Sequence, residues 1–216
     1  AHRRVAEDPS FDIQMLPTWR PDRALAVDQP EVFNAWLDRL EAASDMACDS
    51  YDALLEALRA RAHFFKSRGC KMADHGLETP YSEEYTLSEV RAAFTKARSG
   101  KAPSAEVAAA YKSAVMYELC LLNHDMGWAQ QLHLGPIRNN NTRMFHALGP
   151  DSGFDSVGDL PMARPLAKFL DRLDREDRLT RTVLYTINPA ANMMLATMTG
   201  NFQDGSVPGK IQFGSG

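Results

Sequence analysis

The sequence predicts an α/β fold built as a (β/α) barrel, or as a piece of one. Short apolar segments alternate with longer amphipathic segments along the 216 residues, in the order expected of parallel strands joined by crossover helices. The predicted strands are short and the helices are long, which favours a barrel over a wide, doubly wound sheet. No G-x-G-x-x-G sequence follows the first predicted strand, and this weakens a dinucleotide-binding fold.

The first predicted strand runs from Phe11 to Thr18, and the prolines around it end the ladder. Arg20 should therefore lie just past the carboxyl end of this strand. A helix follows, for which Asp28 is the predicted N-cap and Pro30 occupies the first turn. Ser50 is the predicted cap of the next helix.

A second, short strand is predicted from Cys70 to Ala73, and it delivers Asp74 and His75 at its end. Thr86 and Glu89 have the spacing of a capping box, which predicts the start of another helix.

The stretch from Trp128 to Phe145 is the most informative part of the chain. An apolar segment passes through His133 and breaks at a Gly-Pro pair. A loop of planar polar side chains follows, made of Arg138, Asn139, Asn140, Asn141 and Arg143. Asparagine offers both a donor and an acceptor, and arginine offers a fork that fits a carboxylate. An anion or carbohydrate site and a plain polar turn are both consistent with this loop.

The last third of the chain predicts further strand and helix pairs. Gly149 to Asp159 is rich in turn residues, and Asp159 is the predicted cap of the helix that follows it. A β-rich segment, Thr182 to Ile187, precedes a helix from about Ala190 to Thr199. The final predicted strand is Lys210 to Phe213.

The carboxyl ends of the strands in a parallel barrel lie together and carry its chemistry. Reading those ends gives Arg20, Asp74, His75, His133, Arg138, Asn188 and Ser215. Structural alternatives stand beside these roles. Arg20 could pair with Asp22 at the surface, Asp74 and His75 could be a helix cap and a solvated histidine, and His133 could be a buried core histidine.

Composition indicates a soluble globular protein, with 44% hydrophobic and 24% charged residues. The formal net charge of −4 and the scattered basic residues argue against nucleic-acid binding. No apolar run is long enough to span a membrane. The three cysteines, without metal-ligand spacing, indicate reduced thiols in the cytoplasm. Both ends look interrupted, so we expect the chain to be part of a longer one.

Several segments, in the same order along nearly the whole chain, carry a resemblance to a known family. They are LPTWRPD, CKMADHGLETPY, WAQQLHLGPIRNNNTRMFHALGPDSGFDSVGD, LYTINP, ATMTGNFQD and GKIQFGSG. With these segments the sequence resembles uronate isomerase, also called glucuronate isomerase, of the amidohydrolase superfamily.

The resemblance implies a (β/α)8 barrel of the metal-dependent hydrolase kind, with residues 1–216 forming one partial barrel domain of about strands 2 to 6, without the first and last strands. It implies interconversion of D-glucuronate with D-fructuronate, and of D-galacturonate with D-tagaturonate. It also implies Zn²⁺ or another divalent metal, held in the family by a first-strand H-x-H pair and a last-strand aspartate. Neither is present here, so most ligands would lie outside this chain, which alone should be inactive.

Site residues follow from the same resemblance. Arg20, Asp74 and His133 match active-site positions, and His133 is the one candidate for a metal ligand. Arg20, Arg138, Asn139 and Asn140 are the expected substrate-binding residues. We expect a hexuronate as the small-molecule partner, and a cytoplasmic homo-oligomer. Another metal-dependent hydrolase activity, or a non-catalytic fragment, remains the alternative.

Overall fold

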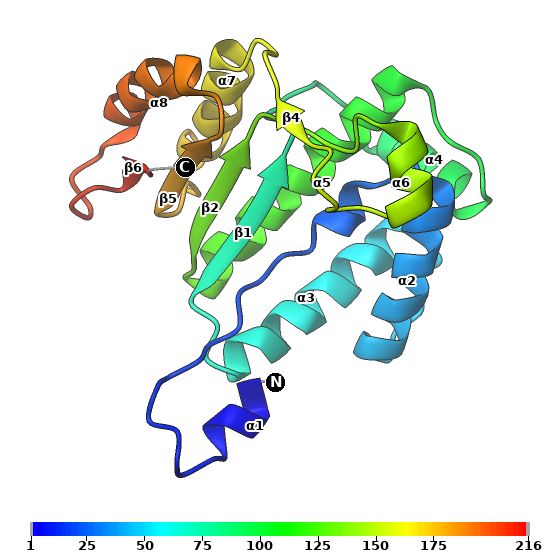
Figure 1. The fold of residues 1–216 in the computed structure, drawn as a ribbon, viewed down its shortest axis with the longest axis horizontal. Coiled ribbons are helices and arrows are strands. Elements are labelled where there is room, and N and C mark those ends of the chain that lie inside the picture. Colours follow the sequence, from blue (N-terminus) through cyan, green and yellow to red (C-terminus); the bar gives the residue numbers. More distant parts are fainter. Residues whose placement is uncertain (1, 215–216) are drawn as a thin grey trace.

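The computed structural model describes residues 2–214 and shows an α/β fold (Figure 1). In this part of the chain, four parallel strands form one sheet in the order β1-β2-β5-β6, and β3 pairs with β4 in a separate antiparallel ribbon. The strands are β1 Met72–Leu77, β2 Ala129–Leu134, β3 Pro136–Ile137, β4 Ser156–Val157, β5 Thr182–Thr186 and β6 Ile211–Phe213.

Helices connect the parallel strands, which confirms the predicted crossover pattern. Helices α4 and α5 lie between β1 and β2 in the chain, α7 lies between β2 and β5, and α8 between β5 and β6. The helices are α1 His2–Ala6, α2 Pro30–Ser44, α3 Tyr51–Ser67, α4 Leu87–Arg98, α5 Ala105–Met126, α6 Thr142–Leu148, α7 Ala163–Asp174 and α8 Asn192–Thr199, with 3-10 turns η1 Asp22–Leu25, η2 Pro189–Ala191 and η3 Gly200–Phe202.

The predicted strand from Phe11 to Thr18 is wrong. Within the described residues, this part of the chain pairs with β1 through Trp19 alone, whose N–H donates to the Met72 carbonyl at 3.0 Å. Phe11, Ile13 and Met15 have no layer to pack against and are exposed, Ile13 to 68%, whereas Pro17 is buried. A strand is stabilised by such packing, so none forms here. Arg20 nevertheless follows the paired residue directly.

Of the four predicted helix caps, two are confirmed and two, Asp28 and Asp159, are wrong. Ser50 accepts a hydrogen bond from the first turn of α3, and Thr86 with Glu89 forms the capping box of α4. Asp28 does not cap α2, because its carboxylate instead accepts a hydrogen bond from Lys112 Nζ at 2.8 Å. The proline in the first turn of α2 holds the helical conformation without a side-chain cap.

The segment after β2 is more ordered than the sequence predicts. The expected loop Gly149 to Asp159 contains β4, and the expected polar loop after His133 contains α6, capped by Asn141. A two-residue strand is too short to show periodicity, so β4 was not predicted; α6 has only seven residues and follows a run of three asparagines, which indicates a polar loop. Asp159 does not cap α7, since Met162 occupies that position without a side-chain hydrogen bond.

One face of the sheet packs against the helices, and α5 lies at the centre of this packing (Figure 1). Tyr111 on α5 is fully buried, with its ring edge-on to Phe33 of α2 at a centroid distance of 6.1 Å. Burial of each large apolar side chain contributes about 1.5–3 kcal/mol. Within residues 2–214, no helix combines the length and apolar character needed to cross a bilayer.

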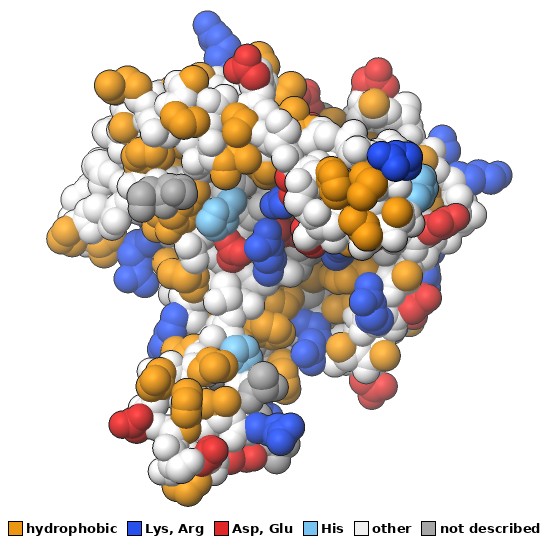
Figure 2. All heavy atoms as spheres, in the orientation of Figure 1, with side chains coloured by type: hydrophobic (Ala, Val, Ile, Leu, Met, Phe, Trp, Pro, Cys, Tyr) orange, Lys and Arg blue, Asp and Glu red, His pale blue; other side chains and the backbone are white. Residues whose placement is uncertain are grey.

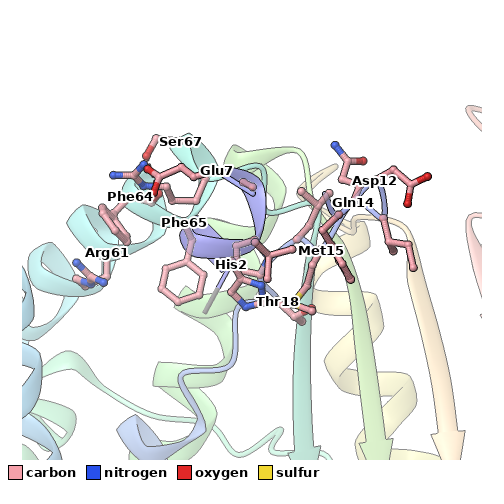
Figure 3. A pocket seen from close by; sticks show the side chains of 17 residues that line it. His2, Glu7, Asp12, Gln14, Met15, Thr18, Arg61, Phe64, Phe65 and Ser67 are labelled. Carbon is pink, nitrogen blue, oxygen red and sulfur yellow. Dashed lines mark hydrogen bonds between the residues drawn. The ribbon is translucent and has the colours of Figure 1, made fainter. Parts of the chain in front are cut away.

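A cavity of about 1100 Å³ lies between α1, the extended segment before Trp19 and the end of α3 (Figure 3). Arg61 and Phe64 line the cavity, and the Arg61 guanidinium lies over the Phe64 ring, 4.3 Å from the ring centroid. Thr18, which also lines the cavity, precedes the residue that pairs with the start of β1. The cavity is therefore at the amino end of the sheet, away from the end where barrel enzymes carry their chemistry.

Candidate active site

The candidate site lies on the partly exposed face of the sheet, over β1 and the carboxyl-terminal half of β2. The predicted strand Cys70 to Ala73 was too short, because pairing with β2 continues to Leu77. Asp74 and His75 therefore lie within β1, on opposite faces. The Asp74 side chain is 16% exposed, whereas His75 is completely buried against the helices, so the alternative of a solvated His75 is wrong.

Three of the predicted residues meet on this face. Arg20 Nη1 donates to Asp74 Oδ2 at 2.8 Å, and His133 Nε2 lies 2.9 Å from Asp74 Oδ1. The side chains of Arg20 and His133 are 49% and 44% exposed, so His133 is not a core histidine. Figure 2 shows acidic, basic and histidine side chains side by side in the region of β1 and β2. The cluster can bind an anion and hydrogen-bond to hydroxyl groups.

Asp22 supports this cluster from η1. Arg20 Nε donates to Asp22 Oδ2 at 3.2 Å, so the predicted surface pair exists alongside the contact with Asp74. Asp22 also accepts from the Gly76 N–H at 2.8 Å and lies 2.8 Å from His75 Nδ1. Burial raises the pKa of the Asp22 carboxyl, but the hydrogen bonds with His75 and Gly76 and the positive charge of Arg20 oppose this, and the pKa lies below its usual value.

Gly76 makes room for the arginine. A side chain at this position would meet Arg20 Nη2 well inside the 3.0 Å that real Cβ contacts respect. Gly76 is also paired in register with His133 across β1 and β2. The absence of a side chain thus allows the guanidinium to lie over the strand next to the imidazole.

Tyr185 is a site residue that sequence reasoning missed. It pairs in register with His133, and the two rings are stacked with centroids 4.5 Å apart and planes 8° apart. On its other side the ring contacts the backbone of Gly214, where a Cβ would overlap with it. Only the register between β2 and β5 reveals this neighbour, because the sequence marks Tyr185 as an ordinary strand residue.

Arg138, Asn139 and Asn140 make their hydrogen bonds within the β3–β4 ribbon. Arg138 Nη1 and the Asn139 N–H donate to the two oxygens of Asp155, and these bonds lower the pKa of that carboxyl. Asn140 Nδ2 donates to the carbonyl oxygen of Ile137 at 2.9 Å. Their described contacts do not run to Arg20, Asp74 or His133, so a substrate-binding role for them stays a prediction.

The remaining strand-end residues divide into two cases. Asn188 donates from Nδ2 to the Gly158 carbonyl at 2.9 Å and accepts from the Ala190 N–H at 3.0 Å, so it ties β5 to the preceding loop. Ser215 lies outside the described residues.

The described residues supply only part of a metal site. Asp74 Oδ1 is buried without a hydrogen-bond partner, and it faces His133 Nε2 at 2.9 Å. These are two suitable donor atoms, whereas a catalytic zinc takes about three protein ligands. Among residues 2–214, no group of three or more His, Cys, Asp or Glu side chains could hold a metal ion. This part of the chain does not form a complete metal centre by itself.

A parallel sheet with crossover helices and a charged cluster on its partly exposed face indicate a segment of a (β/α) barrel. The glucuronate isomerase family model matches residues 1–216. The chain belongs to the glucuronate isomerase family.

Individual relatives agree with this assignment. Uronate isomerase from Cellvibrio japonicus is 53% identical over 215 residues, which cover 100% of this chain and 46% of that protein. The relative from Phocaeicola vulgatus is 51% identical, over 97% of this chain and 45% of its own length. The chain therefore spans about half the length of the curated relatives that it matches.

Solved structures show the same fold. The crystal structure of uronate isomerase from Thermotoga maritima has a TM-score of 0.89 and 30% identity, over 98% of this chain and 45% of that one. Glucuronate isomerase from Caulobacter crescentus has a TM-score of 0.84 over 98% of this chain and 42% of that one; at 23% identity, this likeness shows the fold alone. The predicted barrel fold class is confirmed.

Proposed function

We propose that the intact protein carrying this chain is an aldose–ketose isomerase of hexuronates. It interconverts D-glucuronate with D-fructuronate, and D-galacturonate with D-tagaturonate, by moving a proton between C2 and C1 through a cis-enediol. The observation that carries the proposal is the cluster of Arg20, Asp74 and His133 on the partly exposed face of the sheet, in a chain from the glucuronate isomerase family.

The geometry supports a role for each residue of the cluster. Arg20 Nε and Nη1 are engaged by Asp22 and Asp74, which leaves the Nη2 edge for the substrate carboxylate. Asp74, whose two oxygens lie 2.8 Å from Arg20 Nη1 and 2.9 Å from His133 Nε2, hydrogen-bonds a substrate hydroxyl or orients these two neighbours. His133 orients or polarises the neighbouring substrate oxygen, where negative charge develops in the enediol.

Other parts of the reaction belong to residues outside this chain. We propose that residues 1–216 form a partial barrel domain without the first and last barrel strands. A divalent metal is held mostly by residues beyond this segment, with His133 as the candidate ligand within it, and the main proton-transfer base also lies beyond it. The segment alone is then inactive. A homo-oligomeric, cytoplasmic enzyme remains our expectation.

The anchoring role of Arg20 is tested by Arg20→Ala in the intact protein. The matched control is Arg91→Ala, because Arg91 is similarly exposed and pairs with Asp52 on the helical surface. Loss of a charge-assisted hydrogen bond costs about 1.5–3 kcal/mol, so Arg20→Ala should raise KM for D-glucuronate roughly tenfold to a hundredfold. Equal KM values for the two variants would contradict the role, and absence of isomerisation by the wild type would contradict the proposed function.

A further inference from the structure

A chain of buried hydrogen bonds runs beneath the candidate site, on the covered face of the sheet. It crosses three strands and one helix, and its first four side chains are at most 1% exposed. Its members, in order, are Thr182 on β5, Gln130 on β2, Asn123 on α5, His75 on β1 and Asp22 on η1. Side chains of this kind need partners when buried, and here their hydrogen bonds run to one another, although Asn123 Oδ1 is buried without a partner.

The direction of each bond is fixed from the far end. The Thr182 hydroxyl lies 2.8 Å from the Thr180 carbonyl, which can only accept, so the hydroxyl donates there. The hydroxyl oxygen of Thr182 then accepts from Gln130 Nε2 at 3.0 Å. The amide oxygen of Gln130 therefore faces Asn123, whose Nδ2 donates to it at 3.2 Å. With this assignment the amide oxygen of Gln130 and the amide nitrogen of Asn123 face each other.

The same logic sets the protonation site of the histidine. Asn123 Nδ2 has a second hydrogen, which it directs at His75 Nε2 over 3.3 Å. A ring nitrogen that accepts a hydrogen bond carries no proton, so neutral His75 is protonated at Nδ1. Nδ1–H then donates to Asp22 Oδ1 at 2.8 Å.

We propose that Asn123 and His75 are positioning residues for Arg20. The buried chain holds His75 as the Nδ1–H tautomer, His75 fixes Asp22 through Oδ1, and Asp22 Oδ2 directs the guanidinium through Arg20 Nε at 3.2 Å. The Gly76 N–H donates to the same Oδ2 at 2.8 Å and locks the carboxylate plane. The effect on substrate binding rests on the proposed function, whereas the tautomer rests on the hydrogen-bond geometry.

The tautomer is tested first, because it requires neither a variant nor a substrate. A long-range ¹H–¹⁵N spectrum of the ¹⁵N-labelled intact protein distinguishes protonated from unprotonated ring nitrogens. We expect the His75 ring to carry its proton at Nδ1 and none at Nε2. A spectrum that shows His75 protonated at Nε2 would overturn the proposal.

A pair of variants then tests the effect on the site. In His75→Asn the amide nitrogen takes the place of Nδ1 and can donate to Asp22, whereas in His75→Gln the amide reaches the place of Nε2 instead. If the contact positions Arg20, His75→Gln raises KM for D-glucuronate about tenfold with a smaller change in kcat, and His75→Asn restores KM toward the wild-type value. A merely structural role lowers the active fraction in both variants and leaves KM unchanged.

Equal KM values for the two folded variants would therefore overturn the positioning role. If the wild-type protein does not isomerise hexuronates, the proposed function fails, while the tautomer spectrum still decides whether the buried chain sets His75. If neither variant folds, the wild-type spectrum still determines which ring nitrogen of His75 is protonated, and protonation at Nε2 overturns the proposal.

Discussion

Replacement of Gly76 with alanine perturbs the candidate site while leaving its polar groups in place. Gly76 does not have a positive φ, so the backbone accepts an alanine. The new methyl group would overlap with Arg20 Nη2, the end of a flexible side chain that can move. Relief of the overlap requires a shift of roughly 1 Å, because ordinary contacts are near 3.5–4.0 Å. That shift breaks the 2.8 Å hydrogen bond from Arg20 Nη1 to Asp74.

The effect on folding and the effect on binding should differ in size. Loss of a half-exposed ion pair costs about 0.2–1 kcal/mol, and a compatible glycine-to-alanine change gains about 0.4–1 kcal/mol, so the free energy of unfolding changes little. A misdirected guanidinium loses about 1.5–3 kcal/mol of binding to the substrate carboxylate. KM for D-glucuronate should therefore rise roughly tenfold to a hundredfold.

The assay compares steady-state kinetics and thermal unfolding of the intact protein with those of a matched variant. Gly200→Ala serves as the control, because Gly200 also has a negative φ and no atom lies within 4 Å of the added Cβ. Wild-type KM in Gly76→Ala, at unchanged stability, would refute the reasoning that this glycine holds a place for Arg20.

Two further predictions concern Tyr185 and Glu118. Tyr185→Leu removes the ring that stacks on His133, a contact worth about 0.5–1.5 kcal/mol, so kcat/KM should fall about twofold to tenfold. Tyr185→Phe keeps a ring and should lower kcat/KM by less. Equal losses of kcat/KM in both variants would argue against a role for the stacked rings. Burial raises the pKa of Glu118 above 4.5, although Arg59 and Arg172 oppose the rise, so its ionised form destabilises the folded state above that raised pKa. Glu118→Gln should raise the free energy of unfolding at pH 7, and this gain should shrink as the pH falls through the raised pKa toward 4.5. Urea unfolding at pH 7 and at pH 4.5 measures the gain. The exposed Glu56→Gln is the control and should show no such gain at either pH.

The order of strands and helices could be predicted from the sequence because it depends on local patterns. The capping box of Thr86 and Glu89 and the Ser50 cap are determined by neighbouring residues, and both are present. Asp28 has the right residue type for a cap but finds Lys112 instead, 84 positions away. A local pattern cannot show such a competing partner.

The candidate site was predictable because its residues lie in or just after short strands, although β1 continues past Asp74 to Leu77. Arg20, Asp74 and His133 were predicted, and the structure brings them together. Tyr185 and Gly76 were missed because their roles depend on the register between strands, which determines the residues that are paired with His133. Residue type alone gives no indication of that register.

The same alternation along the strands produces both the site and its support. Asp74 and His75 are neighbours in the chain, yet one faces the charged cluster and the other faces the buried chain of hydrogen bonds. In β2, Gln130 and His133 are three residues apart and therefore also lie on opposite faces, so that His133 joins the cluster and Gln130 joins the buried chain. A shift of one residue in the pairing of β1 with β2 would exchange the two faces. The buried polar side chains therefore make any other register costly, because it would leave them without partners. Formation of the buried hydrogen-bond chain and placement of Arg20 beside Asp74 therefore both depend on the same register of β1 with β2.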